Sequence, residues 1–238
     1  MKLKGQVAIV TGAGRGIGRA VALAFSREGA RVALASRTTA ALNEVAALIR
    51  SQNGLALVAP TDVSQEPSVA ALVERTLAEW GQVDILLTAA GVAAFGPVGD
   101  SKLSEWDQMM AVNLRGVYLT CRAVLAPMMA RRQGTIINVV SAAAKRPIPG
   151  CAAYAASKHG VLGFSRVLAE ELRAHGIRVG ALVPGAVDTP LWDQIPDAPD
   201  RTRMLRPQDV AEAAVLMASL PAGASLEELT LLPAGGIL

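Results

Sequence analysis

Residues 6–18, "QVAIVTGAGRGIG", join a short apolar run to a glycine-rich loop. The run predicts a strand over 6–11, and a helix should begin near residue 16. Small residues let a backbone approach a phosphate closely, and the helix supplies free N–H groups and the positive end of its dipole. A tight turn is the alternative, but a strand before and a helix after are the context of a phosphate-binding loop. The predicted phosphate-binding residues are Gly12, Gly14, Arg15, Gly16, Ile17 and Gly18.

The rest of the chain alternates apolar runs with longer amphipathic stretches. Further strands are predicted at 31–36, 55–61, 83–91, 134–141, 177–185 and 229–232. Helices are predicted near 16–28, 39–52, 65–80, 104–132, 152–175 and 207–219. Because the strands are nearly continuous apolar runs, both faces of their sheet should be covered. The alternation predicts an α/β fold in one domain, residues 1–238, with a doubly wound, mostly parallel seven-stranded sheet and helices on both faces.

Composition excludes several classes of function. Hydrophobic residues make up 52% of the 238 residues and charged residues 18%, which is typical of a globular protein. The net charge of +3 is too small and too evenly spread to indicate a nucleic-acid or membrane partner. The N-terminus runs directly into a strand, and no apolar run approaches the ~18 residues of a membrane span. Cys121 and Cys151 fit neither a metal site nor a disulfide framework, so we expect no metal, reduced thiols and a cytoplasmic protein.

A second motif, "YAASK" at 154–158, places a tyrosine and a lysine on one face of a predicted helix. Ser141 ends the strand before it, so all three side chains should meet at the carboxyl edge of the sheet, where such folds bind ligands. A free tyrosine titrates near ~10, and a nearby ammonium would lower that pKa. We expect Tyr154 to transfer a proton, Lys158 to tune it, and Ser141 to polarise a substrate oxygen.

The loop "TGAGRGIG" together with Ser141 and "YAASK" resembles the short-chain dehydrogenase/reductase family, and the resemblance runs the length of the chain. It implies a Rossmann fold, a nicotinamide cofactor and hydride transfer between that cofactor and a carbonyl or alcohol. It also implies a fourth catalytic residue, Asn113, which holds a water that connects the lysine to solvent. The family usually forms homodimers or homotetramers through the helices predicted at 104–132 and 152–175.

The end of the second strand indicates which nicotinamide cofactor is used. An NAD site usually has an acidic residue there, but this chain has "ASRT" at 35–38. Arg37 is placed to bind a 2′-phosphate, Ser36 and Thr38 can donate hydrogen bonds, and Arg15 adds a second positive charge. Arg37 as the exposed start of a helix is the alternative. The missing acid favours NADP(H).

The resemblance implies further cofactor contacts. One stretch departs from the family, which typically shows Asn–Asn–Ala–Gly where this chain has "TAAG" at 88–91, so both amide side chains are missing. The "PGAVDTP" stretch at 184–190 matches the family's loop near the nicotinamide. The implied contacts are Asp62 and Val63 at the adenine, then Ala89, Ala90, Gly91, Pro184, Gly185, Val187 and Thr189, with Tyr154 and Lys158 at the ribose.

These features predict NADPH-dependent reduction of a ketone or aldehyde, with Tyr154 as the acid. The chain looks closest to 3-oxoacyl-[acyl-carrier-protein] reductases, and Arg131 and Arg132 are candidates to dock an acidic carrier protein. A reductase of a small ketone, sugar, steroid or pterin is the alternative within the family. A non-catalytic NADP-binding sensor is the alternative outside enzymes. Trp192 and Met204 flank the expected substrate loop and can either line the pocket or pack elsewhere.

Overall fold

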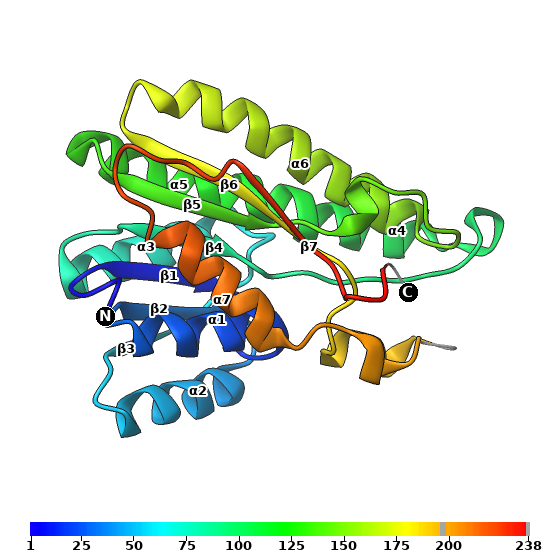
Figure 1. Ribbon diagram of the computed structural model, residues 1–238, viewed down its shortest axis with the longest axis horizontal. Helices are drawn as coiled ribbons and strands as arrows, with labels where there is room; N and C mark the ends of the chain where they lie inside the picture. Colours follow the sequence, from blue (N-terminus) through cyan, green and yellow to red (C-terminus); the bar gives the residue numbers. More distant parts are fainter. Residues whose placement is uncertain (196–198, 237–238) are drawn as a thin grey trace.

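The computed structural model describes residues 1–195 and 199–236, and a seven-stranded sheet forms its centre (Figure 1). The strand order is β3-β2-β1-β4-β5-β6-β7, and each neighbouring pair is parallel. The strands are β1 (Val7–Thr11), β2 (Arg31–Ser36), β3 (Ala56–Pro60), β4 (Ile85–Thr88), β5 (Gly134–Val139), β6 (Ile177–Pro184) and β7 (Glu228–Leu231). This architecture confirms the predicted doubly wound α/β fold.

Helices cover the sheet on both faces. They are α1 (Gly16–Arg27), α2 (Thr39–Ser51), α3 (Glu66–Trp80), α4 (Leu103–Met109), α5 (Gly116–Arg131), α6 (Ala152–Arg173) and α7 (Pro207–Ala218). Helices α1, α2 and α7 share one core with the sheet, and α3, α5 and α6 share the other. No helix within the described ranges is both long enough and apolar enough to cross a bilayer.

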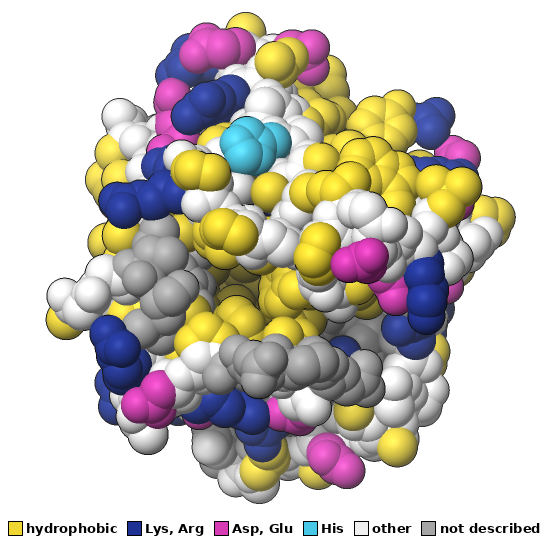
Figure 2. All heavy atoms as spheres, turned by 90° about the vertical axis from the view of Figure 1, so that its right-hand side faces the viewer, with side chains coloured by type: hydrophobic (Ala, Val, Ile, Leu, Met, Phe, Trp, Pro, Cys, Tyr) yellow, Lys and Arg dark blue, Asp and Glu magenta, His cyan; other side chains and the backbone are white. Residues whose placement is uncertain are grey.

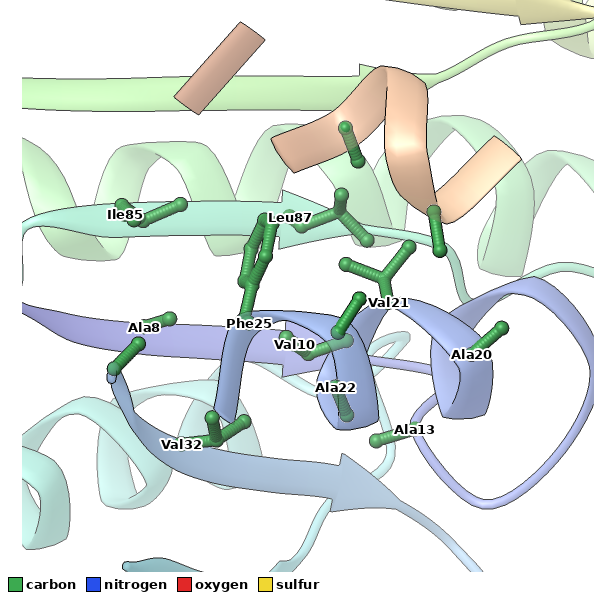
Figure 3. Close-up of a cluster of buried hydrophobic side chains, with 14 of the residues drawn as sticks. Ala8, Val10, Ala13, Ala20, Val21, Ala22, Phe25, Val32, Ile85 and Leu87 are labelled. Atoms are coloured by element: carbon green, nitrogen blue, oxygen red, sulfur yellow. The ribbon is translucent and has the colours of Figure 1, made fainter. Parts of the chain in front are cut away.

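Alternate residues of each strand point into the two cores. Ala8 and Val10 of β1 face α1, whereas Ile9 between them belongs to the opposite core. In Figure 3, Phe25 of α1 lies over β1 and β4 and points toward Leu87. Because both faces are buried, the inner strands have no polar face, which explains their continuous apolar sequences. At the edge of the sheet β7 differs, since Thr230 lies outside both cores and accepts a hydrogen bond from Lys145.

The helix predicted over 104–132 is not uniform. Between α4 and α5 the chain forms a π-helical segment, Met110–Arg115, which contains Asn113. Turns of this kind are rare and occur often at functional sites. The sequence pattern predicted a continuous α-helix because the segment keeps its apolar residues and contains no proline.

The glycine loop brings backbone against backbone. Gly12 has a φ of 68°, and a Cβ there would lie 2.7 Å from the carbonyl carbon of Ala89. A Cβ on Gly18, in the first turn of α1, would overlap the carbonyl group of Gly12. The loop therefore requires glycine at both positions for steric reasons.

Gly18→Ala should destabilise the protein by about 1–3 kcal/mol, because the added methyl group meets rigid backbone. Gly163→Ala is the matched control, since this exposed residue of α6 has no atom within 4 Å of an added Cβ. In the helix, alanine should stabilise the control by about 0.5–1 kcal/mol. Urea unfolding measures both, and equal effects of the two substitutions would refute the steric argument.

Candidate active site

A cleft of about 800 Å³ opens at the carboxyl edge of the sheet. Figure 2 shows this face, with hydrophobic side chains lining a central hollow and charged side chains around it. The residues predicted from sequence to bind cofactor or to act in catalysis line the cleft, with two exceptions. Gly18 is buried beneath the glycine loop, and Asn113 is fully buried outside the cleft lining. The fold thus brings together residues from the ends of six strands, β1 to β6, and from the start of α6.

The "TAAG" turn is held without the two missing amide side chains. The hydroxyl of Thr11, at the end of β1, accepts hydrogen bonds from the backbone N–H groups of Ala89 (3.1 Å) and Ala90 (3.3 Å). Thr88 donates to Asn138 of β5 at 2.8 Å, and Asn138 donates to Ser165 of α6 at 2.9 Å. The strands are therefore tied together at this edge by hydroxyl groups and by Asn138.

One end of the cleft combines positive charge with an unpaired donor. Ser36 Oγ is buried and has no hydrogen-bond partner among the described residues. Arg37 beside it is exposed, and the pKa of Asp62 is lowered mainly by its hydrogen bond from Ser64, with the charge of Arg37 contributing. A buried hydroxyl without a partner is unfavourable. A ligand that places an anionic oxygen at this end would satisfy both Ser36 and Arg37.

The catalytic candidates meet at the other end. Lys158 Nζ donates to the backbone carbonyl of Val139 at 3.0 Å and lies 5.7 Å from the centroid of the Tyr154 ring. Ser141 Oγ, at the end of β5, accepts a hydrogen bond from the N–H of Ala143 at 3.2 Å. Further along α6, the face that carries Tyr154 and Lys158 continues into the core as a buried stripe through Val161, Ser165 and Leu168. The first turn of this helix opens into the cleft.

Burial dominates the protonation of this pair. It raises the pKa of Tyr154 to about 12, against a smaller lowering by a hydrogen bond from Ser141. It also lowers the pKa of Lys158 to about 8, because an ammonium loses its hydration there. The expected lowering of the tyrosine pKa by the lysine is therefore not seen in the protein alone. Tyr154 is protonated at neutral pH and can donate a proton.

Asn113 binds protein groups on three sides. Its Oδ1 accepts from the N–H of Val92 at 2.9 Å, and its Nδ2 donates to the carbonyl of Val92 (2.9 Å) and to Ser157 Oγ (3.1 Å). Ser157 in turn donates to the carbonyl of Tyr154 at 2.7 Å. The π-helical segment thus connects the chain after β4 to the first turn of α6. This arrangement positions the helix that carries Tyr154.

Sequence reasoning missed an aromatic cluster beside Tyr154. The Phe95 ring centroid lies 5.7 Å from that of Tyr154, with an interplanar angle of 89°, and 5.8 Å from that of Trp192. Trp192 lines the cleft, Cys151 is both buried and part of the lining, and Met204 is buried but does not line it. One feature of the sequence could have pointed to this cluster: aromatic residues are scarce, with only three Phe, three Trp and two Tyr in the chain.

The expected carrier-docking arginines do not serve the cleft. Arg131 is paired with Asp84 at 2.8 Å, just before β4 begins, and Arg132 donates to the carbonyl of Ala174. Both residues lie at the amino edge of the sheet, across the length of the strands from the cleft. Within one chain these two arginines therefore do not border the cleft, and the docking of a carrier protein stays a prediction.

The loop that carries Trp192 has its own anchors. Trp192 Nε1 donates to the carbonyl of Val187 at 2.9 Å, close to the end of β6. Arg201 binds Asp188 at 2.5 Å and Asp193 at 2.7 Å, and its remaining donor reaches the carbonyl of Thr189. These contacts fix the segment that borders the catalytic end.

A doubly wound parallel sheet with a glycine loop and a Ser–Tyr–Lys set at its carboxyl edge defines a Rossmann-type oxidoreductase. The chain matches the short chain dehydrogenase family over residues 6–200. It is 37% identical over 227 residues to a D-threitol dehydrogenase of Mycolicibacterium smegmatis, covering 92% of this chain and 87% of that protein. It is 34% identical to a 3-oxoacyl-[acyl-carrier-protein] reductase of a Synechocystis species, covering 99% and 98%.

A solved structure gives the same result. A metagenomic short-chain oxidoreductase in complex with NADP superimposes with a TM-score of 0.87 at 38% identity, covering 98% of this chain and 99% of that one. The protein therefore belongs to the short-chain dehydrogenase/reductase family. It is an oxidoreductase that acts on CH–OH groups.

Lys158→Met should change how stability depends on pH in the cofactor-free protein. The pKa of Lys158 is about 8 in the folded state, against 10.5 for an exposed lysine. Between these values the unfolded state binds more protons, so this lysine makes the free energy of unfolding rise with pH. Below about pH 8 both states are protonated, and the destabilisation by the buried ammonium is constant.

Urea unfolding of both proteins between about pH 7.5 and 9.5 measures this effect. Relative to wild type, the free energy of unfolding of Lys158→Met should fall as the pH rises. The cysteine and tyrosine titrations occur in both proteins and cancel in the difference. A difference that stays constant across this range would show that Lys158 keeps an ordinary pKa.

Proposed function

We propose that this protein is an NADPH-dependent carbonyl reductase with Tyr154 as general acid. The observation that carries the proposal is the placement of Tyr154 beside Ser141 and Lys158, in the same cleft as Ser36 and Arg37. NADPH, when bound, supplies the hydride that reduces the carbonyl carbon. Tyr154 gives its hydroxyl proton to the oxygen of that carbonyl, which becomes the alcohol. The reverse reaction, oxidation of an alcohol, would use the tyrosinate as the base.

Each neighbouring group has a distinct role in this scheme. Ser141 donates a hydrogen bond to the substrate oxygen and stabilises the charge that develops on it. Lys158 has donors left beyond its bond to Val139, and these can bind ribose hydroxyl groups. Its positive charge also stabilises the tyrosinate that remains after proton transfer. Asn113 acts as a positioning residue through its hydrogen bond to Ser157. We also propose that a bound water molecule connects Asn113 to Lys158.

The adenosine end supports NADP(H) over NAD(H). Ser36 offers an unpaired buried hydroxyl, Arg37 and Arg15 line the same cleft, and no carboxylate ends β2. The metagenomic relative with a similar fold was solved with NADP. In this scheme Asp62 and Val63 flank the adenine.

The names of the relatives leave several substrates open. A D-threitol dehydrogenase and a 3-oxoacyl-[acyl-carrier-protein] reductase match the chain at 37% and 34% identity. Within one chain Arg131 and Arg132 do not border the cleft, so they do not favour the carrier-bound substrate over the others.

We also propose a homo-oligomer, supported by a surface hollow whose lining, apart from Arg115, is hydrophobic and includes Tyr118 of α5 and Phe164 of α6. Tyr118 of α5 and Val167 of α6 are also large hydrophobic side chains that stand exposed on these helices.

Tyr154→Phe should lower kcat for carbonyl reduction by about 10²–10⁴-fold, because the variant has no proton to donate. Tyr118→Phe is the matched control, since this tyrosine is exposed and lies outside the cleft. NADPH oxidation with a panel of ketones measures turnover, and NADPH fluorescence confirms that the variant still binds the cofactor. Full turnover by Tyr154→Phe would exclude it as the acid.

Arg37→Asp should reverse the cofactor preference. The carboxylate repels a 2′-phosphate and can accept hydrogen bonds from a ribose hydroxyl, so KM for NADPH should rise about 10–100-fold while KM for NADH falls. Arg37→Gln is the control, because it removes the positive charge without adding an acceptor carboxylate. This control variant should lose affinity for NADPH without gaining affinity for NADH. A variant Arg37→Asp that still prefers NADPH would sink the assignment.

A further inference from the structure

Three aromatic rings meet where the proposed proton donor lies. Phe95 follows β4 and packs edge-on against Tyr154, and Trp192 follows β6 and packs against Phe95. The chain has so few aromatic residues that this grouping accounts for a large share of them. Phe95 and Trp192 both line the cleft and form what we call the aromatic wall.

The cleft around the aromatic wall is apolar. Ile148, Pro149, Leu191 and Ile195 line it beside Phe95 and Trp192. Figure 2 shows hydrophobic side chains within the hollow on this face of the molecule. The wall therefore offers a substrate hydrocarbon contacts rather than hydrogen bonds.

The charged side chains of the described lining lie elsewhere. They are Arg15, Arg37, Asp62 and Lys158, which belong to the proposed cofactor contacts or to the catalytic set. Arg201 stands near the loop, but its guanidinium is occupied by Asp188, Asp193 and the carbonyl of Thr189. None of the described side chains beside the aromatic wall is therefore available to bind a carboxylate or phosphate on the substrate.

Polar partners near the catalytic end are also few. Ser141 and Tyr154 are committed to the reacting oxygen, and the indole N–H of Trp192 is bound to Val187. Cys151 adds only a thiol, which is a weak donor, and burial raises its pKa. A polyol would leave its other hydroxyl groups without partners against the aromatic wall, which is unfavourable.

We propose that the substrate is an uncharged ketone with a hydrocarbon side group, and that the aromatic wall holds that group. This inference rests on the proposed carbonyl reductase function and names its substrate class. The carbonyl oxygen lies toward Ser141 and Tyr154, and the hydrocarbon group packs against Phe95 and Trp192. Selection comes from two sources: apolar contact with the correct group, and unpaired hydroxyl groups or charges in the wrong one.

The test compares three carbonyl compounds with NADPH and the full-length protein. They are 4-phenyl-2-butanone, the polyhydroxylated 1,3,4-trihydroxy-2-butanone, and the acetoacetyl thioester of N-acetylcysteamine. We expect kcat/KM for the phenyl ketone to exceed that for the trihydroxy ketone on the order of 100-fold, and that for the thioester on the order of tenfold. A higher kcat/KM for either competitor would overturn the substrate class.

Trp192→Ala tests the wall itself. It should lower kcat/KM for 4-phenyl-2-butanone about tenfold, mainly through KM, and change that for 2-butanone less than about threefold, because the small ketone lacks the group that reaches the wall. Trp80→Phe is the control, since Trp80 ends α3 and does not line the cleft. Equal losses for both ketones in Trp192→Ala would contradict the inference.

The outcomes separate this inference from the function on which it rests. If NADPH binds but none of the three compounds oxidises it, the carbonyl reductase proposal itself fails. If turnover occurs and the trihydroxy ketone or the thioester is preferred, the reductase proposal survives and the hydrocarbon substrate class is wrong. Preference for the phenyl ketone, reduced selectively by Trp192→Ala, supports both.

Discussion

A parallel sheet that is buried on both faces leaves only its edges for polar chemistry. In this protein residues 8, 9 and 10 of β1 enter the two cores alternately, so an inner strand has no face free to present a reactive side chain. The reactive groups therefore stand where strands end and helices begin. Turns after each of the strands β1 to β6 contribute to one cleft because the strands run in the same direction.

That arrangement requires the strand ends to keep a fixed relation to one another. Buried hydroxyl and amide groups supply it: Thr11 holds the turn after β4, and Thr88, Asn138 and Ser165 link β4, β5 and α6. Such groups are favourable in a core only when their partners are present. The same hydrogen bonds attach α6, the helix that carries Tyr154, to the sheet.

Much of this was accessible from sequence, for identifiable physical reasons. The spacing of apolar residues predicts the strand, loop and helix of residues 6–18, the order of the elements, and the shared face of Tyr154 and Lys158 on α6. That spacing depends only on the local geometry of strands and helices. The π-helical segment around Asn113 was not predicted, because it depends on bonds to Val92 and Ser157, far along the chain. The dominance of burial over charge at Tyr154 was missed for a similar reason, since desolvation is set by the whole surrounding structure.

The two sides of the catalytic end are carried by different parts of the chain. Ser141, Tyr154 and Lys158 stand on β5 and α6, whereas Phe95 and Trp192 stand on segments after β4 and β6 with separate anchors. Changes in those segments can alter what fits without disturbing the proton donor. Substitutions in these loops can therefore change the substrate specificity of such an enzyme during evolution while its catalytic residues stay the same. This separation of substrate loops from catalytic residues agrees with the comparisons, in which a D-threitol dehydrogenase and a 3-oxoacyl-[acyl-carrier-protein] reductase are similarly related to the chain.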